Sequence, residues 1–126
     1  MNDRQIHVAI VGVGPFGRYF AEIYAKHPNV SGISIYDNNA DTLRDAATSL
    51  GVERCHARFE DVIHCPEINA VHVASPAPMH AQQTEQVLKA GKHCACAVPM
   101  ATSLEGIAAV IDAQRIGATG ISLGGI

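Results

Sequence analysis

The architecture of this chain follows from one stretch near its start, Ile6-His-Val-Ala-Ile-Val-Gly-Val-Gly-Pro-Phe-Gly17. The first half, Ile6–Val11, is apolar and rich in β-branched residues, which is typical of a strand buried on both faces of a sheet. The second half carries glycines at the spacing Gly-x-Gly-x-x-Gly. Gly12 permits a tight turn, Gly14 lets a pyrophosphate approach the backbone, and Gly17 lets a helix pack closely on the strand.

A helix is expected directly after these glycines, over Arg18–Lys26, with an apolar face formed by Phe16, Phe20, Ile23 and Tyr24. The first N–H groups of a helix have no partner within the helix, and the helix dipole favours negative charge at that end. The turn before this helix is therefore expected to bind a phosphate group.

An acidic residue, Asp37, ends the second expected strand, Gly32–Tyr36. It comes twenty residues after Gly17, the distance at which an acid at the tip of the second strand accepts hydrogen bonds from ribose hydroxyls. Asp37 is alternatively the N-cap or Asx-turn residue of the next helix, expected at Ala40–Leu50, because Asp often takes that place. Both roles are open from the sequence, and we expect the ribose contact.

Strand and helix patterns alternate along the whole chain, which is the mark of a parallel sheet covered by helices. Strands are expected at Ile6–Val11, Gly32–Tyr36, Arg54–His56, Ala70–Ala74, His93–Ala97 and Ala118–Leu123. Further helices are expected at Phe59–His64, Met79–Ala90 and from a cap at Thr102 or Ser103 to about Arg115. Six strands with five crossovers form a doubly wound α/β sheet of the Rossmann type, in the order 3-2-1-4-5-6. Such sheets bind ligands at the carboxyl ends of their strands, where the order reverses.

Composition and charge are those of a globular protein with one domain, residues 1–126. The sequence is 48% hydrophobic and 17% charged, values typical of a packed core. A net charge of −3 without a basic tract gives no sign of binding to nucleic acid or to an anionic membrane. The apolar runs are too short to span a bilayer, and the polar start leaves no room for a signal peptide. Four cysteines do not indicate a disulfide scaffold, so a reducing cytoplasm is the expected location.

Two groups of residues suggest other chemistry. In an extended strand Cys94 and Cys96 share one face while His93 points the other way. We therefore expect no metal site there and interpret the cysteines as small apolar core residues. Ser75 and His80 stand at the same strand tip but lack the Gly-x-Ser-x-Gly elbow of a hydrolase. No catalytic or metal-binding residue is assigned.

Taken together, the strand tips resemble the Gfo/Idh/MocA family of nicotinamide-dependent oxidoreductases. The likeness covers almost the whole chain and rests on Gly12-Val-Gly-Pro-Phe-Gly17, Asp37, Ser75-Pro-Ala-Pro-Met-His80, Ala90-Gly-Lys-His93 and Pro99-Met-Ala101. The resemblance implies that the turn after Ser75 lies along the nicotinamide half of the cofactor, with His80 nearby. It also implies that Asp37 holds the adenosine ribose.

The glycine turn and the resemblance together give a set of residues expected to bind the cofactor. This set is Gly12, Gly14, Pro15, Phe16, Gly17, Asp37, Asn38, Ser75, Pro76, His80 and Val98. The dinucleotide itself performs the redox chemistry, so none of these residues is given a catalytic role. Because a carboxylate at Asp37 would repel a 2′-phosphate, NAD is expected rather than NADP.

Two features depart from the family pattern. Most members have Glu-Lys-Pro after the fifth strand, where the lysine positions the substrate and polarises the reacting oxygen. Here the residues are Ala97-Val98-Pro99, and valine has neither a proton nor a charge to give. Members also continue into a second domain that builds much of the substrate pocket, and this C-terminal substrate domain is absent from the 126 residues.

The main hypothesis is therefore an NAD-binding domain of an oxidoreductase. The full-length enzyme would act on a sugar, inositol or related hydroxy compound, and the domain would not be catalytically competent alone. A second hypothesis, supported by Val98, is a non-catalytic nucleotide-binding or sensing module. A third is an S-adenosylmethionine-binding domain, since methyltransferases also place a glycine turn and an acid after their first two strands. The expected partners are a nicotinamide dinucleotide and either a second copy of the chain or the missing domain.

Overall fold

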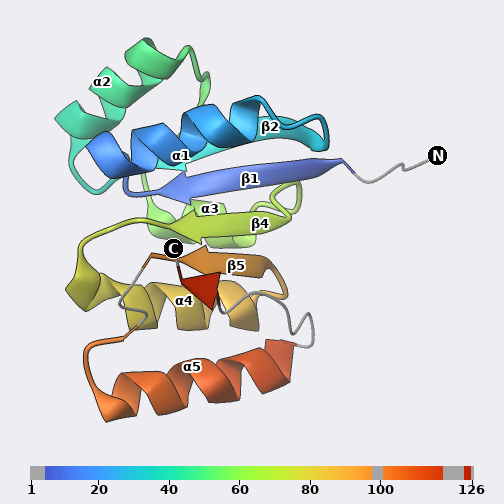
Figure 1. The fold of residues 1–126 in the computed structure, drawn as a ribbon, viewed down its shortest axis with the longest axis vertical. Helices are drawn as coiled ribbons and strands as arrows, with labels where there is room; N and C mark the ends of the chain where they lie inside the picture. The colour runs from blue at the N-terminus through green and yellow to red at the C-terminus, as the bar shows by residue number, and fades with distance from the viewer. Residues whose placement is uncertain (1–4, 98–100, 118–123, 126) are drawn as a thin grey trace.

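The computed structural model describes residues 5–97, 101–117 and 124–125. Its centre is a parallel sheet of six strands in the order β3-β2-β1-β4-β5-β6, which confirms the predicted order. The strands are β1 (Ile6–Val11), β2 (Val30–Tyr36), β3 (Arg54–His56), β4 (Ala70–Val73), β5 (His93–Cys96) and β6 (Gly124–Gly125). Because the strands are parallel, their carboxyl ends lie at one edge of the sheet, the left edge in Figure 1. The order reverses between β1 and β4.

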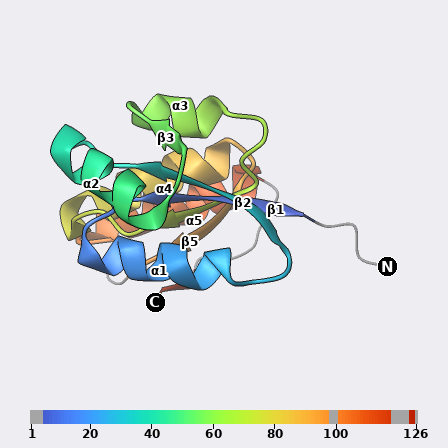
Figure 2. The ribbon, with the colours of Figure 1, turned by 90° about the horizontal axis from the view of Figure 1, so that it is seen from above.

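The helices form a layer on each face of the sheet (Figure 2). They are α1 (Pro15–Ala25), α2 (Ala40–Leu50), α3 (Phe59–His64), α4 (His80–Lys89) and α5 (Leu104–Gly117). Apolar side chains of α1 and α2 pack with one face of β1 and β2, in a core that includes Ile10 and Ile35. Those of α3, α4 and α5 pack on the opposite face, in a core that includes Val71 and Val73. The central strands are therefore buried on both sides, as their apolar sequence predicts.

The first helix begins at Pro15 rather than at the expected Arg18. Proline suits the first helical position because its fixed φ is helical and its missing N–H would have no partner there. The second strand also begins earlier than expected, at Val30, because Val30 pairs with Ile6 of β1. Each end thus depends on a local backbone feature that side-chain periodicity does not report.

Between β4 and α4 the chain makes a tight turn at Pro76 and Pro78, and α4 starts one residue later than the expected Met79. A turn of 3₁₀ helix, Ala77–Met79, precedes α4, which starts at His80. The last strand was expected at residues 118–123, which lie outside the described residues. The strand that the structure describes is β6, and it pairs with Ala95 and Cys96 of β5.

The expected apolar face of α1 is divided between packed and exposed side chains. Phe20 stacks on His72 of β4, and Tyr24 shares a hydrogen bond with the same imidazole. Phe16 and Ile23 are 50% and 46% exposed. Beside α1, a groove of about 250 Å³ runs over Ala70 and neighbouring residues of β4 and β5.

Within the described residues, every helix is too short or too polar to cross a bilayer.

Candidate functional site

The carboxyl ends of β1, β2 and β4 surround an open groove of about 390 Å³. The groove brings together nine of the eleven residues predicted to bind a cofactor: Gly12, Gly14, Pro15, Phe16, Gly17, Asp37, Asn38, Ser75 and Pro76. His80 does not line it but is buried behind Ser75. Val98 lies outside the described residues. The groove sits where the strand order reverses, the place at which doubly wound sheets bind ligands.

Gly12 is held at the point where the β1 and β4 tips touch. Its φ is +93°, a region that favours glycine. A Cβ on Gly12 would lie 2.6 Å from the backbone nitrogen of Ser75 and 2.7 Å from the carbonyl atoms of Ala74. The first glycine of the motif is therefore required by the turn and also by the contact between the two strand tips.

Gly14 and Gly17 stand in opposite surroundings. A Cβ on Gly17 would lie 1.8 Å from the carbonyl oxygen of Gly12, so only glycine lets α1 approach β1 this closely. Among the described residues, a Cβ on Gly14 would meet no atom within 4 Å apart from its chain neighbours, and the φ of Gly14 is an ordinary −68°. Neither packing nor backbone conformation explains a glycine at position 14. The open space above it fits a diphosphate that lies against the backbone.

The start of α1 offers N–H groups to this space. Within the described part of the chain, the backbone nitrogens of Gly14, Phe16 and Gly17 have no hydrogen-bond acceptor, and Pro15 has no N–H. The helix dipole adds positive potential at the same end. This end of α1 therefore suits an anion that approaches the backbone. It offers free N–H groups, the positive end of the helix dipole and open space over Gly14.

Asp37 connects the β2 tip to the glycine turn. Its Oδ2 accepts a hydrogen bond from the backbone N–H of Val13 at 3.0 Å, and its Oδ1 accepts one from Asn39 at 2.8 Å. The bond to Asn39 is the Asx turn that the sequence left open. The N-cap of α2 is Asn39 itself, whose side chain accepts from Thr42 at 3.0 Å. Asp37 thus makes the local turn and also lies in the groove with the glycines.

A residue that the sequence did not single out, Arg18, braces the back of the glycine turn. Its Nε donates to the carbonyl oxygen of Val13 at 2.9 Å, and its guanidinium reaches the carbonyl oxygen of Thr42 at 3.5 Å. Arg18 therefore ties α1 to the turn and to α2. Local patterns do not reveal this role, because an arginine one position after the last glycine looks like any charge on a helix surface.

The β4 tip is held by two buried side chains of α4. Nε2–H of His80 donates to the carbonyl oxygen of Ser75, and the Ser75 hydroxyl donates to Oε1 of Gln83. His80 and Gln83 are 3% and 4% exposed. The spacing of three residues that places both on one face of α4 is visible in the sequence, but the burial of that face against β4 is not.

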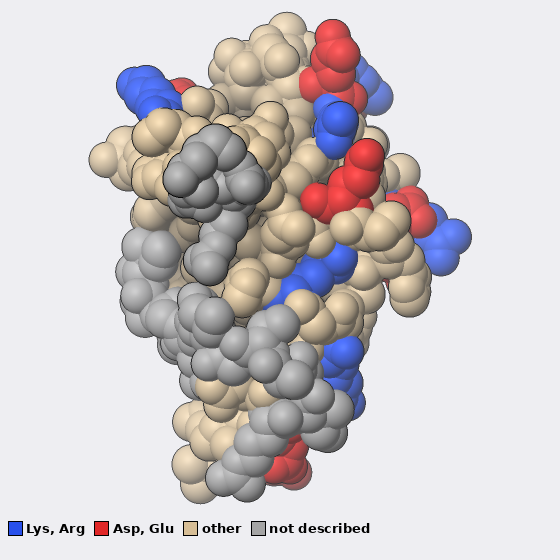
Figure 3. Space-filling view, turned by 90° about the vertical axis from the view of Figure 1, so that its right-hand side faces the viewer, with Lys and Arg blue, Asp and Glu red and all other residues tan. Residues whose placement is uncertain are grey.

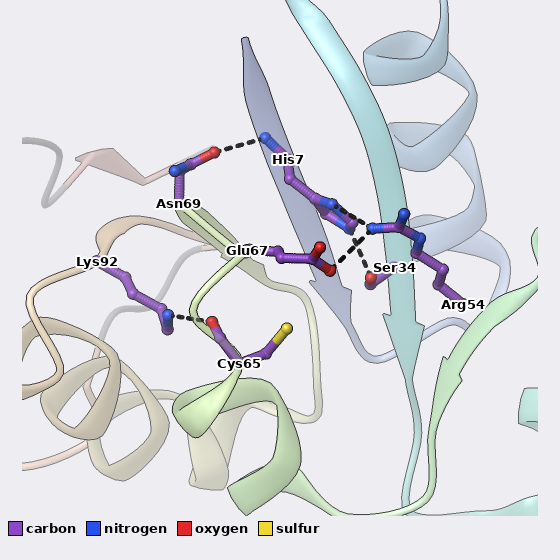
Figure 4. A network of polar contacts seen from close by, with 7 residues as sticks. All are labelled: His7, Ser34, Arg54, Cys65, Glu67, Asn69 and Lys92. Atoms are coloured by element: carbon purple, nitrogen blue, oxygen red, sulfur yellow. Dashed lines mark hydrogen bonds and ion pairs between the residues drawn. The ribbon is translucent and has the colours of Figure 1, made fainter.

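A second polar cluster lies at the opposite edge, near the amino ends of the strands (Figure 4). Arg54 donates to Nδ1 of His7 at 3.0 Å, so the ring proton is on Nε2, which donates to Oγ of Ser34 at 2.6 Å. Burial and the Arg54 charge lower the pKa of His7, which keeps the imidazole neutral. With its proton directed at Ser34, His7 cannot act as a base toward that hydroxyl.

The same edge carries further structural bonds rather than a site for chemistry. The Lys92 ammonium donates to the carbonyl oxygens of Cys65 and Ile68, each at 2.8 Å. These bonds close the loop between α3 and β4. In the face shown in Figure 3, acidic and basic side chains of the described residues are intermixed.

The two strand cysteines lie in the core on the α4 side. Cys94 and Cys96 are 1% and 0% exposed, and burial raises the pKa of the Cys94 thiol to about 12. Such a thiol stays protonated and is a poor metal ligand. Among the described residues, no group of three or more His, Cys, Asp or Glu side chains could hold a metal ion.

Comparison with known proteins shows the family of this chain. Residues 6–117 match a family described as an oxidoreductase family with an NAD-binding Rossmann fold. The uncharacterized oxidoreductase YrbE of Bacillus subtilis is 29% identical over 89% of this chain and 33% of its own length. Inositol 2-dehydrogenase of Klebsiella pneumoniae is also 29% identical, over 86% of this chain and 33% of its own length.

A solved structure gives the same result. The WlbA dehydrogenase from Bordetella pertussis, in complex with NADH and UDP-GlcNAcA, is 26% identical to this chain with a TM-score of 0.86. The match covers 100% of this chain and 36% of that one. The chain spans about a third of the length of the curated relatives it matches.

Proposed function

We propose that this chain binds a nicotinamide dinucleotide in the groove at the β1, β2 and β4 tips. The chain belongs to the Gfo/Idh/MocA family of oxidoreductases with an NAD-binding Rossmann fold. The observation that carries this proposal is the open space over Gly14: apart from its chain neighbours, no atom of the described residues lies within 4 Å of where its Cβ would be. The diphosphate would lie in that space and accept hydrogen bonds from the free N–H groups of Gly14, Phe16 and Gly17.

The remaining predicted residues take their places around this anchor. Asp37 and Asn38 would contact the adenosine ribose, since both line the groove at the β2 tip. Ser75 and Pro76 would lie along the nicotinamide half, supported from behind by His80. When bound, the nicotinamide supplies the hydride chemistry. The residues of this chain bind and orient it.

We further propose that NAD is preferred over NADP. Asp37 presents a carboxylate where a 2′-phosphate would stand, and the repulsion disfavours the phosphorylated cofactor. Arg18, on the first turn of α1, is directed at the carbonyl oxygens of Val13 and Thr42. An arginine engaged in this way supports NAD rather than a 2′-phosphate pocket.

The activity of the whole protein is a proposal that rests on its relatives. Those named above include an inositol 2-dehydrogenase and a dehydrogenase bound to a UDP-sugar. We propose that this chain supplies the dinucleotide-binding domain, residues 1–126, of an enzyme that oxidises or reduces a hydroxy compound of the sugar or inositol class. The substrate pocket would be built by a second domain, as the length of the relatives suggests.

Titration calorimetry with NADH, NADPH and S-adenosylmethionine tests the cofactor proposal directly. We expect binding of NADH, weaker binding of NADPH and no binding of S-adenosylmethionine. Asp37→Ala should weaken NADH binding by about 1.5–3 kcal/mol, the cost of losing a hydrogen bond to a charged group. An unchanged NADH affinity would remove Asp37 from the site.

The matched control is Asp41→Ala. Asp41 is also an acid near the start of α2, but its carboxylate pairs with Arg44 at 2.9 Å on the exposed surface. We expect this variant to bind NADH like the unaltered chain. Because Asp37 also holds Val13 and Asn39, a thermal melt of Asp37→Ala is needed to show that the fold persists at the titration temperature.

A further inference from the structure

The Ser75 turn at the β4 tip is fixed by two side chains of α4 that act on different atoms. His80 takes the Ser75 carbonyl oxygen, and Gln83 takes the Ser75 hydroxyl proton. Both side chains are almost fully buried, whereas Ser75 itself lines the open groove. Ser75 is therefore the link between the groove and a buried polar pair on α4.

The direction of the hydroxyl bond decides what Ser75 can offer a ligand. A serine hydroxyl has one proton and two acceptor lone pairs. Because Oε1 of Gln83 accepts the proton, only lone pairs remain on the side of Ser75 that faces the groove. Ser75 would then accept hydrogen bonds from ligand N–H or O–H groups and would not donate to ligand oxygens.

The surroundings of Gln83 keep its side-chain oxygen bonded to the Ser75 hydroxyl. It borders a small cavity of about 20 Å³ together with Gly12, Asp37 and Ser75, at the junction of the three strand tips. At 4% exposed, its side chain has little access to water, so an unpaired oxygen there would be costly. The Ser75–Gln83 bond is thus held from the buried side.

We infer that Gln83 is a positioning residue for the nicotinamide half of the site. Its side-chain oxygen holds the Ser75 hydroxyl proton and so presents Ser75 to the dinucleotide as a hydrogen-bond acceptor. The matching donors on the nicotinamide side are the carboxamide N–H₂ and the ribose hydroxyls. This inference rests on the proposed function, because it requires that the dinucleotide lie along Ser75.

The test compares NADH with ADP-ribose, which lacks the nicotinamide, in calorimetric titrations of the same variants. Gln83→Leu removes the acceptor at similar size, and we expect it to weaken NADH binding about tenfold while ADP-ribose binding changes less than about twofold. Gln83→Glu keeps an acceptor oxygen and should restore NADH affinity to within about threefold of the unaltered chain. Gln82→Leu, an exposed neighbour on α4, is the matched control and should change neither affinity.

The outcomes separate this inference from the proposed function. Absence of NADH binding by the unaltered chain would overturn the proposed function. NADH binding that survives Gln83→Leu, or that falls together with ADP-ribose binding, would overturn the role of Gln83 alone. A Glu variant as weak as the Leu variant would also overturn it, because Gln83 would then act through its N–H₂ group. If Gln83→Leu does not fold, Ser75→Ala replaces it: a selective loss of NADH affinity supports the inference, and equal losses for both ligands contradict it.

Discussion

At the scale of single residues, the three glycines of the turn between β1 and α1 are required for three different reasons. Gly12 has a positive φ and touches the β4 tip, whereas Gly17 lies under the Gly12 carbonyl. Gly14 has neither constraint. One sequence motif therefore contains two positions that serve the fold and one, Gly14, for which we propose contact with a ligand.

This difference gives a prediction with opposite outcomes at neighbouring glycines. Gly14→Ala adds a methyl group to open space, so the free energy of unfolding should change by less than about 1 kcal/mol. Its NADH affinity should fall at least about tenfold, because the methyl takes room that the diphosphate needs. Urea unfolding and calorimetry measure the two effects separately. A Gly14→Ala variant that binds NADH normally would contradict the proposed position of the diphosphate.

Gly17→Ala is the matched comparison. Its methyl group would lie 1.8 Å from the Gly12 carbonyl oxygen, so α1 must move away from β1. We expect a loss of about 3 kcal/mol in the free energy of unfolding, the upper range for overpacking a core contact. A stable Gly17→Ala protein would show that the contact between α1 and β1 is looser than the structure has it.

At the scale of elements, α1 is joined to β4 through one buried histidine. His72 is 0% exposed, stacks on Phe20 with ring centroids 4.5 Å apart, and shares a 2.8 Å hydrogen bond with the Tyr24 hydroxyl. Its Nε2 has no partner among the described residues. The packing of α1 on this side of the sheet therefore depends on a neutral imidazole.

The pH dependence of stability should report this histidine. Burial lowers the pKa of His72 from 6.5 to about 4, so the unfolded chain binds a proton over that range and the folded chain does not. The contribution of His72 to the free energy of unfolding is therefore fully present above pH 6.5 and is lost as the pH falls toward 4. The loss is no more than about 1.4 kcal/mol per pH unit. Chemical denaturation of the unaltered chain and of His72→Gln measures the difference. Equal slopes for both proteins would contradict the prediction.

The lowered pKa of His7 acts in the same direction and is common to both proteins, so the comparison cancels it.

The element boundaries were predictable to different degrees. Local patterns located β1, α2, β3 and α3 at the residues where the structure has them. The start of α1 was missed, because Pro15 sets it and apolar periodicity does not register a proline.

At the scale of the whole molecule, the sheet brings residues from distant parts of the chain into one groove. Right-handed crossovers place α1 and α2 on one face and the later helices on the other, so the strand tips on either side of β1 meet at the reversal point. The groove is lined by residues of three strand tips that were predicted to bind the cofactor. We propose that the surface for a second reactant comes from another domain.

The purified 126-residue chain should therefore bind NAD(H) without turning it over. Hydride transfer requires a second reactant held within about 3–3.5 Å of the nicotinamide, and Val98 supplies neither the proton nor the charge of the lysine common at that position. We expect no change in NADH absorbance when the chain is mixed with NAD and myo-inositol, scyllo-inositol or UDP-sugars. Turnover that persists in a homogeneous preparation and disappears in Asp37→Ala would contradict this prediction.

The sequence by itself determined the alternation of strands and helices, the strand order and the residues around the groove. These features depend on local signals: β-branched runs, glycine and proline positions, and an acid at a fixed distance from the turn. The contact of Gly12 with the β4 tip, the bond from Val13 to Asp37 and the hold of Gln83 on Ser75 came only from the tertiary structure. They join segments on different strands and helices, and no local pattern states the distance between two side chains that only the packed sheet brings together.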